Sequence, residues 1–299
     1  MRRLAGYLAL ILLWIPGAAL AEDVLVLKSG DLELYNRAVE GVTSSYRVEH
    51  GERVTVIALD ELMGDEPTRI APAAPDVVIS VGAAATRYAV AHYREHPVVY
   101  CMVVEPEKLE LTPYSIGISM FVPVSDLLAT LRLVSPNIRH IGVLHAPGHR
   151  EVVTEAIDRM SGFEARLIPV EVGDARQLPR LARRLVMQSD ALWIVPGTLT
   201  SLDAMQFLLK LSFEHRVPLV ADSPAMVRAG ALLAVMPDPV DLGRQAARLA
   251  GYLLSGEGLP PDRLFYPDIA DLAINLRTAR TLGIEVPPLL ITFASVVIE

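Results

Sequence analysis

Cysteine is almost absent from this sequence, with Cys101 the single one among 299 residues. No intramolecular disulfide can therefore form, even in an oxidising compartment. Cys101 lies within an apolar run, residues 98–104, with no obvious base beside it in the sequence. This setting favours a buried, inert thiol over a catalytic nucleophile.

Basic residues are also scarce, with 27 Lys and Arg against 35 Asp and Glu and a formal charge of −8. No stretch concentrates the positive charge into a stripe or patch. Binding to nucleic acid depends on such positive charge, so nucleic acid is not an expected partner.

Three well-known motifs of catalysis or nucleotide binding are missing. The sequence contains no G-x-x-x-x-G-K-[ST], no G-x-S-x-G and no H-E-x-x-H. The short glycine run Gly256-Glu257-Gly258 follows a predicted helix and continues into Pro260, which indicates a linker. We therefore expect a non-enzyme without a cofactor, and we keep an exported enzyme as the least favoured alternative.

Long apolar runs are confined to the N-terminus. Arg2 and Arg3 precede an apolar run at residues 4–15, a breaker at Pro16-Gly17 and small residues ending at Ala21. This layout predicts a signal peptide over residues 1–21 and a periplasmic protein, with an uncleaved anchor as the alternative. Removal of residues 1–21 takes away two Arg, leaving 25 basic against 35 acidic residues and a charge of −10. The remaining 278 residues suit two lobes.

The stretch 190–245 is the most informative part of the chain, because strands, small-residue turns and helices follow one another there. Apolar runs at 191–195, 217–221 and 231–235 are predicted strands buried on both faces. Predicted helices begin at Ser201, Ser223 and Asp238. Such alternation is typical of a parallel sheet in an α/β fold.

The same alternation runs through the first half of the chain. PDVVISVGAAATRYAV and SDALWIVPGTLTSLDAM, one in each half, both place Asp before an apolar strand, then tiny residues, then a helix. We interpret them as corresponding parts of two similar lobes. Further strands are predicted at residues 24–27, 53–59, 76–81, 97–103, 115–120, 140–144, 165–172, 264–266 and 272–274.

Candidate ligand-binding residues follow the predicted strands, because open α/β sheets bind ligands at the carboxyl ends of their strands. Small residues leave room there, and backbone N–H groups and hydroxyls donate hydrogen bonds to a small polar molecule. For Ser, Thr and Asp the alternative role is helix capping. An ammonium group on the ligand would bind Asp222. The candidates are Ser29, Gly30, Asp31, Gly82, Ala83, Ala84 and Thr86 in the first half, and Thr198, Leu199, Thr200, Ser201, Asp222 and Ser223 in the second.

Two histidines, His145 and His149, have a spacing that would suit a metal if the segment were helical. Pro147-Gly148 between them predicts a turn instead. Two solvent-facing loop histidines are therefore favoured over a metal site, and no metal is expected.

Four segments together resemble a known family: PDVVISVG, DALWIVPGTLTS, RAGALLAVMPDPVDLGRQAA and AINLRTARTLG. They are similar to the substrate-binding proteins of bacterial ABC importers of the tryptophan and tyrosine type. The resemblance implies a type I periplasmic-binding-protein fold, with two Rossmann-like lobes, parallel sheets and three crossovers near Met120, Asp241 and Asn275. The implied lobes are residues 22–120 with 241–275, and residues 121–240 with 276–299.

The resemblance also implies a function. The protein would capture a small, amino-acid-like molecule between its lobes and, as a monomer, deliver it to an inner-membrane ABC permease. The alternative is a sensor that reports to a membrane receptor or kinase. Tyr35 joins the candidate residues because the family often has an aromatic residue on the helix after the first strand, although a core role is equally compatible. His145–His149 and residues 196–201 lack the polar side chains expected of amino-acid-binding members, which argues against an aromatic amino acid.

Overall fold

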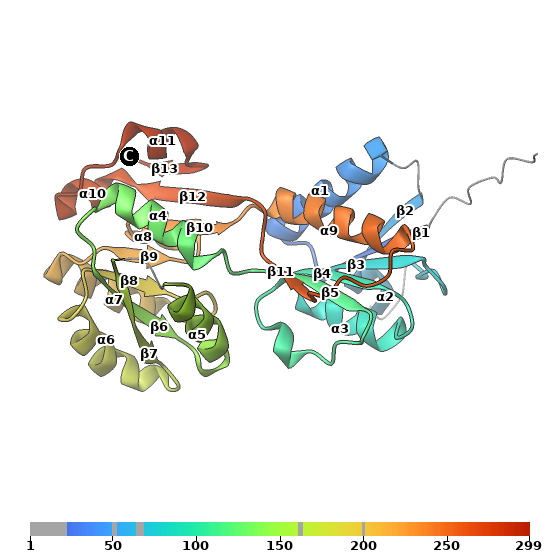
Figure 1. Ribbon diagram of the computed structural model, residues 1–299, viewed down its shortest axis with the longest axis horizontal. Coiled ribbons are helices and arrows are strands. Elements are labelled where there is room, and N and C mark those ends of the chain that lie inside the picture. The colour runs from blue at the N-terminus through green and yellow to red at the C-terminus, as the bar shows by residue number, and fades with distance from the viewer. Residues whose placement is uncertain (1–22, 50–52, 64–68, 161–163, 199–200) are drawn as a thin grey trace, which may run out of the picture.

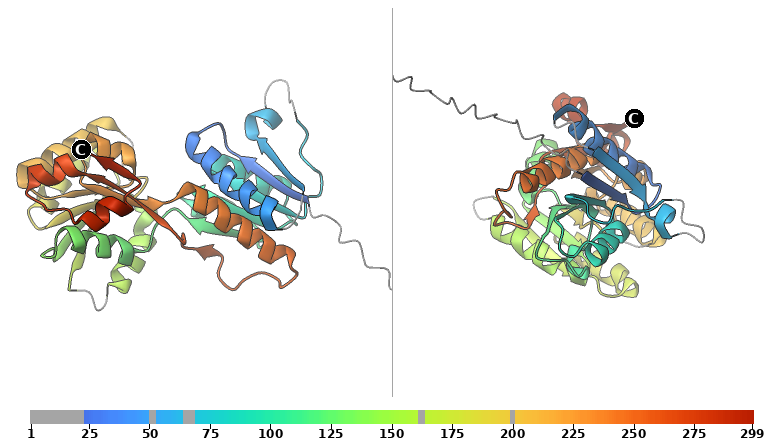
Figure 2. Two further views of the ribbon diagram at one scale, coloured as in Figure 1. Left: turned by 90° about the horizontal axis from the view of Figure 1, so that it is seen from above. Right: turned by 90° about the vertical axis from the view of Figure 1, so that its right-hand side faces the viewer.

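The computed structural model describes residues 23–49, 53–63, 69–160, 164–198 and 201–299. The predicted signal peptide lies outside this range. The chain forms two lobes that lie side by side along the long axis of the molecule and are joined by connecting segments (Figures 1 and 2). Each lobe has one sheet with helices on both faces, as expected for an α/β fold.

The first lobe is built on a six-stranded sheet in the order β11-β5-β4-β3-β1-β2. Every paired strand runs parallel to its neighbour, as the sequence predicts. The strands are β1 (Asp23–Lys28), β2 (Arg53–Ala58), β3 (Val77–Val81), β4 (Val98–Val103), β5 (Ser115–Ser119) and β11 (Leu264–Phe265).

Helices cover both faces of this sheet, because successive side chains of a strand point to opposite sides. Val26 packs with Ala38 of α1 in the core beneath α1 and α9, whereas Leu27 packs with Ala89 of α3 on the other face. Strand β4, which has no charged side chain, is therefore buried along its whole length. The helices are α1 (Glu33–Glu49), α2 (Leu59–Met63), α3 (Ala83–His92) and α9 (Pro239–Leu254), with a 3-10 turn at Pro106–Lys108.

The second lobe contains a seven-stranded sheet in the order β13-β12-β10-β9-β8-β6-β7. Its strands are parallel except for the antiparallel pair β10 and β12. The strands are β6 (His140–His145), β7 (Arg166–Glu171), β8 (Ala191–Ile194), β9 (Leu219–Ala221), β10 (Leu233–Pro237), β12 (Ala270–Asn275) and β13 (Val296–Ile298).

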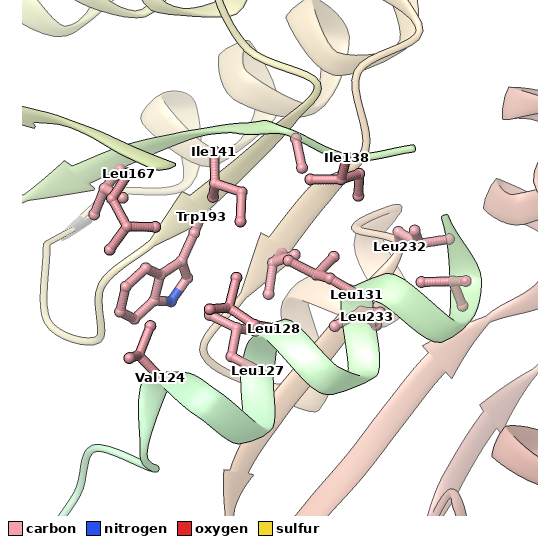
Figure 3. Packing of buried hydrophobic residues seen from close by; sticks show 14 of the residues in the cluster. Val124, Leu127, Leu128, Leu131, Ile138, Ile141, Leu167, Trp193, Leu232 and Leu233 are labelled. Carbon is pink, nitrogen blue, oxygen red and sulfur yellow. The ribbon is translucent and has the colours of Figure 1, made fainter. Parts of the chain in front are cut away.

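Two hydrophobic clusters sandwich the second sheet. On one face Trp193 packs among Val124 and Leu127 of α4 (Figure 3). On the other face Leu208 of α7 packs with Leu185 of α6. The helices of this lobe are α4 (Val124–Val134), α5 (Arg150–Arg159), α6 (Leu178–Val186), α7 (Leu202–His215), α8 (Pro224–Ala229), α10 (Leu276–Leu282) and α11 (Pro288–Phe293), with 3-10 turns at Pro147–His149 and Ala175–Gln177.

Capping residues place several helix starts where the sequence predicts them. The Ser201 side chain accepts a hydrogen bond from the Ala204 amide at the start of α7, and Asp238 accepts one from the Asp241 amide at the start of α9. In the first lobe, α3 begins at Ala83, directly after Gly82, and has no side-chain cap.

Helices α1 and α9 meet in the closest helix contact of the first lobe. A Cβ atom on Gly41 would lie 1.9 Å from the Val240 carbonyl oxygen, and one on Gly243 would lie 1.9 Å from the Ala38 carbonyl oxygen. Both positions therefore require glycine. This contact fixes α9, which follows β10 of the second lobe in sequence, onto the first lobe (Figure 1).

The chain passes between the lobes three times. The first crossing lies between β5 and α4, and the sequence places it near Met120. The second lies at Asp238, between β10 and α9, and the sequence places it near Asp241. The third lies before Ala270, so the expected crossing near Asn275 is wrong. The reason is that β12 pairs with β10, with Leu233 opposite Ile274, and belongs to the second sheet.

Side chains from both lobes hold the third connecting segment. The Gln245 side chain of α9 donates to the Tyr266 carbonyl oxygen at 2.8 Å and accepts from the Asp268 amide at 3.2 Å. The Tyr266 hydroxyl donates to Glu155 of α5 at 2.7 Å, and Arg159 lies over the Tyr266 ring. The segment is therefore bonded to one helix of each lobe.

The C-terminal residues pack only in part, since Leu290 is buried whereas Leu289 and Phe293 are exposed. They form α11 and the edge strand β13, which pairs with β12. Among the described residues, no helix combines the length and the apolar character that crossing a membrane requires.

Candidate functional site

A cavity of about 340 Å³ lies where the two lobes and their connecting segments meet. Its walls come from α1 and β4 of the first lobe, from the ends of β8 and β9 in the second lobe, and from the first two crossings. This volume lies within the range of small-molecule sites, which are usually found between domains. The cavity is therefore the candidate binding site.

Large apolar side chains make up most of the cavity wall. The contributing residues are Met102, Met120, Phe121, Trp193 and Met236. Met102 has a φ of 60°, a left-handed conformation that is uncommon for a residue with a side chain. It lies at an irregularity of the β4–β5 pairing between Tyr100 and Val103. Such bulges redirect side chains and cluster beside functional sites.

A few polar groups also face the cavity: Arg37, Asp222, Ser223, Asp271 and Ser295. The Arg37 guanidinium binds Oδ2 of Asp238 at 3.2 Å, and this pair joins α1 to the second crossing. Burial raises the pKa of the Asp271 carboxyl, and the nearby charge of Asp238 raises it further, whereas Arg37 and Ser295 lower it. The cavity thus carries more carboxylates than cations.

The second-lobe candidates divide into two groups. Asp222 and Ser223 line the cavity, directly after β9. Ser223 is the N-cap residue of α8, but its hydroxyl makes no capping hydrogen bond. Thr198 and Ser201 do not line the cavity: the Thr198 hydroxyl accepts a hydrogen bond from the Ala146 amide of the loop after β6, and Ser201 caps α7. Leu199 and Thr200 lie outside the described residues.

In the first lobe, Ser29, Tyr35 and Gly82 lie together but do not line this cavity. The Ser29 hydroxyl accepts a hydrogen bond from the Ala85 amide at 2.9 Å. Gly82 has a φ of 90°, and a Cβ there would lie 2.6 Å from Ser29 Oγ and 2.8 Å from Tyr35 Cζ. The glycine therefore lets the Tyr35 ring and the Ser29 hydroxyl approach the start of α3.

The remaining first-lobe candidates differ in exposure. Asp31 is exposed and bonded to Lys28 and Asn36; the Asn36 hydrogen bond, followed by Lys28, lowers the pKa of its carboxyl. Thr86 is fully buried, and its hydroxyl bonds to Ser80 and to the Gly82 carbonyl oxygen. Gly30 has open space around it. Ala84 is exposed and Ala83 is half-buried.

The expectation of solvent-facing loop histidines is wrong, since His145 and His149 are 4% and 2% exposed. Neither ring nitrogen of His149 has a hydrogen-bond partner, and its ring packs edge-on against Phe121 of the first crossing. Burial lowers the pKa of His149, although Glu105 and Glu107 oppose this. Across the described ranges, no group of three or more His, Cys, Asp or Glu residues is arranged to hold a metal ion.

The loop after β4 approaches the loops after β6 and β8 across the lobe boundary. A Cβ on Gly148 would lie 3.2 Å from Glu105 Oε1, and one on Gly197 would lie 3.1 Å from Val104 Cγ1. First-lobe and second-lobe loops therefore touch beside the cavity. Small residues at positions 148 and 197 permit that approach.

Comparison with known families identifies the chain. A family model described as ABC transporter substrate binding protein matches residues 65–298. The chain belongs to this family. Members of a family of binding proteins are expected to carry a ligand cavity rather than catalytic groups. The predicted burial of Cys101 is confirmed, and burial raises the pKa of its thiol to about 12.

A curated relative from Clostridioides difficile (strain R20291) is named tyrosine-binding protein. It is 19% identical to this ABC transporter substrate binding protein over 221 residues, which is 70% of this chain. The matched region spans 64% of the relative's length.

Solved structures show the type I periplasmic-binding-protein fold. One, from Streptococcus pneumonia, is an ABC domain in complex with L-Trp; it has 18% identity and a TM-score of 0.59, and the match covers 92% of this chain and all of that chain. Another, from Clostridium difficile, is the ligand-free, open structure of a substrate binding protein with adhesive properties; it has 17% identity and a TM-score of 0.67, and the match covers 90% of this chain and 97% of that chain. The expected fold class is confirmed.

Sequence reasoning missed most of the cavity of this family member. Arg37 and Asp238 are 201 positions apart, so no local pattern signals their contact. Met120 and Phe121 lie on the first crossing, and the search for small polar residues after predicted strands does not select large apolar side chains there. The positive φ of Met102 cannot be predicted from the surrounding sequence VVYCMVV, which contains no glycine or other turn signal.

Proposed function

We propose that this protein is a periplasmic solute-binding protein that holds a small molecule in the interlobe cavity and delivers it to an ABC importer. The observation that carries the proposal is the cavity itself, which has walls from both lobes in a chain of the substrate-binding family. A site of about 340 Å³ accommodates a molecule the size of an amino acid or a small aromatic compound.

Both lobes and the crossings contribute to the same site, and this couples binding to lobe movement. A ligand stabilises the closed arrangement only if it binds that arrangement more tightly than the open one. Arg37 and Met102 on the first lobe and Asp222 and Trp193 on the second supply contacts that exist together only when the lobes are close. The permease would recognise the closed form.

Location and assembly follow from the same role. An ABC importer receives its solute on the outer side of the inner membrane, which agrees with the signal peptide predicted over residues 1–21. A monomer is sufficient, because the cavity is completed by one chain.

Ligand binding tests the proposal. Protein lacking residues 1–21 is screened against metabolites by thermal shift, and each compound that stabilises it is titrated calorimetrically. Ser223→Trp fills the cavity at a position where the hydroxyl caps nothing, and we expect it to weaken binding at least about tenfold. Ser125→Trp, on the exposed surface of α4 in the same lobe, should leave the affinity unchanged. If both variants lost ligand affinity equally, or both kept it, the result would contradict the assignment of the binding site to this cavity.

Delivery is tested in cells. Deletion of the gene should abolish uptake of the identified ligand, as measured with the radiolabelled compound. Normal uptake, with loss of a ligand-dependent transcriptional response, would instead establish a sensor that reports to a membrane receptor.

A further inference from the structure

The charges of the cavity define the class of ligand more narrowly than the fold does. Three carboxylates, those of Asp222, Asp238 and Asp271, lie at or beside the cavity with the guanidinium of Arg37. The formal charge of these four side chains together is −2, and it is −1 when Asp271 is protonated. Among the described residues, Arg37 is the one cationic side chain in the cavity wall.

Arg37 is already paired. Its guanidinium is 3.2 Å from Asp238 Oδ2, and Asp271 lies close enough to both groups for their charges to act on it. A carboxylate on the ligand would have to compete with these two aspartates for a single guanidinium. Among the described residues, an anionic ligand group therefore has no unpaired cationic side chain in the cavity wall, and it would meet repulsion from Asp222.

Asp222, in contrast, has no partner in the part of the chain that the structure describes. It is half-buried after β9, and no hydrogen bond or ion pair of its carboxylate is found within the described residues. The adjacent Ser223 hydroxyl makes no capping hydrogen bond, so its oxygen can accept one from a ligand. A ligand cation beside Asp222 would form a charge-assisted hydrogen bond with its carboxylate.

The rest of the wall suits an apolar body. Three methionines, Met102, Met120 and Met236, and two aromatic residues, Phe121 and Trp193, surround the space. A sugar would leave most of its hydroxyls without partners against these side chains. Methionine adapts to irregular ligand shapes, and aromatic rings attract a nearby cation.

We propose that the cavity binds an organic ammonium ion with an apolar body and without a free carboxylate, with its cationic group on Asp222. This proposal rests on the proposed solute-binding function and narrows it to one ligand class. It separates this chain from a protein that binds zwitterionic amino acids, which must also accommodate the carboxylate of the ligand.

A matched series of compounds tests the charge preference. Tyramine, tyrosine and 4-hydroxyphenylpropionate share one ring and differ in their ammonium and carboxylate groups; tryptamine, tryptophan and indolepropionate repeat the comparison with a larger ring. Calorimetric titration of the chain without residues 1–21 should give the highest affinity for the amines, by about ten- to hundredfold over the amino acids, and the lowest for the acids. Equal or tighter binding of an amino acid or acid would overturn the proposal.

Variants locate the cation. Asp222→Asn should weaken amine binding by about ten- to hundredfold and leave the neutral analogue 4-ethylphenol unaffected. Asp203→Asn, which removes an exposed carboxylate from α7 of the same lobe, should change neither. Unchanged amine binding by Asp222→Asn would contradict the assignment.

A small molecule that stays bound to the protein during purification from its native cells provides a test that does not depend on the chosen compounds. Small molecules released by denaturation are identified by mass spectrometry. A cation without a carboxylate supports the proposal. A neutral or anionic ligand refutes it while leaving the solute-binding function in place, and the absence of any bound or binding small molecule refutes both.

Discussion

Substitution of Gly243 by alanine tests the packing that fixes α9 to the first lobe. The added Cβ would lie 1.9 Å from the Ala38 carbonyl oxygen and 2.9 Å from the Val42 amide nitrogen, both of them backbone atoms of α1. A comfortable contact needs about 3.5 Å, so the two helices must separate by about 1.5 Å. No side-chain rotation relieves this contact.

The expected loss of stability is the balance of two effects. Overpacking of a close contact costs about 1–3 kcal/mol, and the upper part of this range applies because backbone atoms must move. Alanine in a helix interior recovers about 1 kcal/mol relative to glycine. We expect a net destabilisation of about 2 kcal/mol, or a midpoint lowered by roughly 4–8 °C for a protein of this size.

Thermal and urea unfolding followed by far-UV circular dichroism measure this effect. Gly41→Ala, which places a Cβ 1.9 Å from the Val240 carbonyl oxygen, should behave like Gly243→Ala. Gly173→Ala is the matched control, since the nearest atom to its Cβ would be Pro147 Cγ at 3.8 Å, an ordinary contact. Unchanged or increased stability of Gly243→Ala would refute the close approach of α1 and α9.

Three further predictions concern charged and titratable groups. Burial lowers the pKa of His149, so below the ordinary histidine pKa of about 6.5 the unfolded state binds more protons than the folded state. The free energy of unfolding should therefore decrease as the pH drops through that value. In urea unfolding, the decrease between about pH 7 and about pH 5 should be smaller for His149→Gln than for the wild type. Arg37→Gln should lower the free energy of unfolding by about 1 kcal/mol because it leaves Asp238 without its cation, whereas Arg53→Gln, at a more exposed pair, should lower it by less than about 0.5 kcal/mol. Cys101 should react with a thiol reagent only after unfolding, and rapid reaction of the native protein would contradict its burial.

Local sequence patterns predicted most of the strands and helices of the fold. The apolar runs at β3, β4 and β8 are short and continuous, which is typical of strands covered on both faces. Capping residues such as Ser201 and Asp238 marked helix starts, because their side chains bond to nearby amides. These signals depend on residues only a few positions apart.

Assignment of strands to lobes depends on contacts between distant residues, and here prediction failed. The strand β12 has no local sequence feature that indicates which sheet it joins. Its antiparallel pairing with β10, from Leu233 opposite Ile274 to Pro237 opposite Ala270, places it in the second sheet. The boundary near Asn275 was therefore wrong, although the strand itself was predicted.

The site shows the same limit. Asp222 and Ser223 were found because they directly follow a buried strand, and the structure places both in the cavity wall. Arg37 and Asp271 were missed because α1 and β12 approach the cavity only through the interlobe arrangement. For the candidates outside the cavity, such as Ser29, a role in ligand binding stays a prediction.

The most direct test of the central claim is a crystal structure of the protein with the tightest-binding amine of the matched series. We predict density for the compound in the interlobe cavity, with its ammonium group within hydrogen-bond distance of the Asp222 carboxylate and its ring against Met102 and Trp193. Density at any other place on the molecule, with this cavity empty or filled by side chains, would contradict the account.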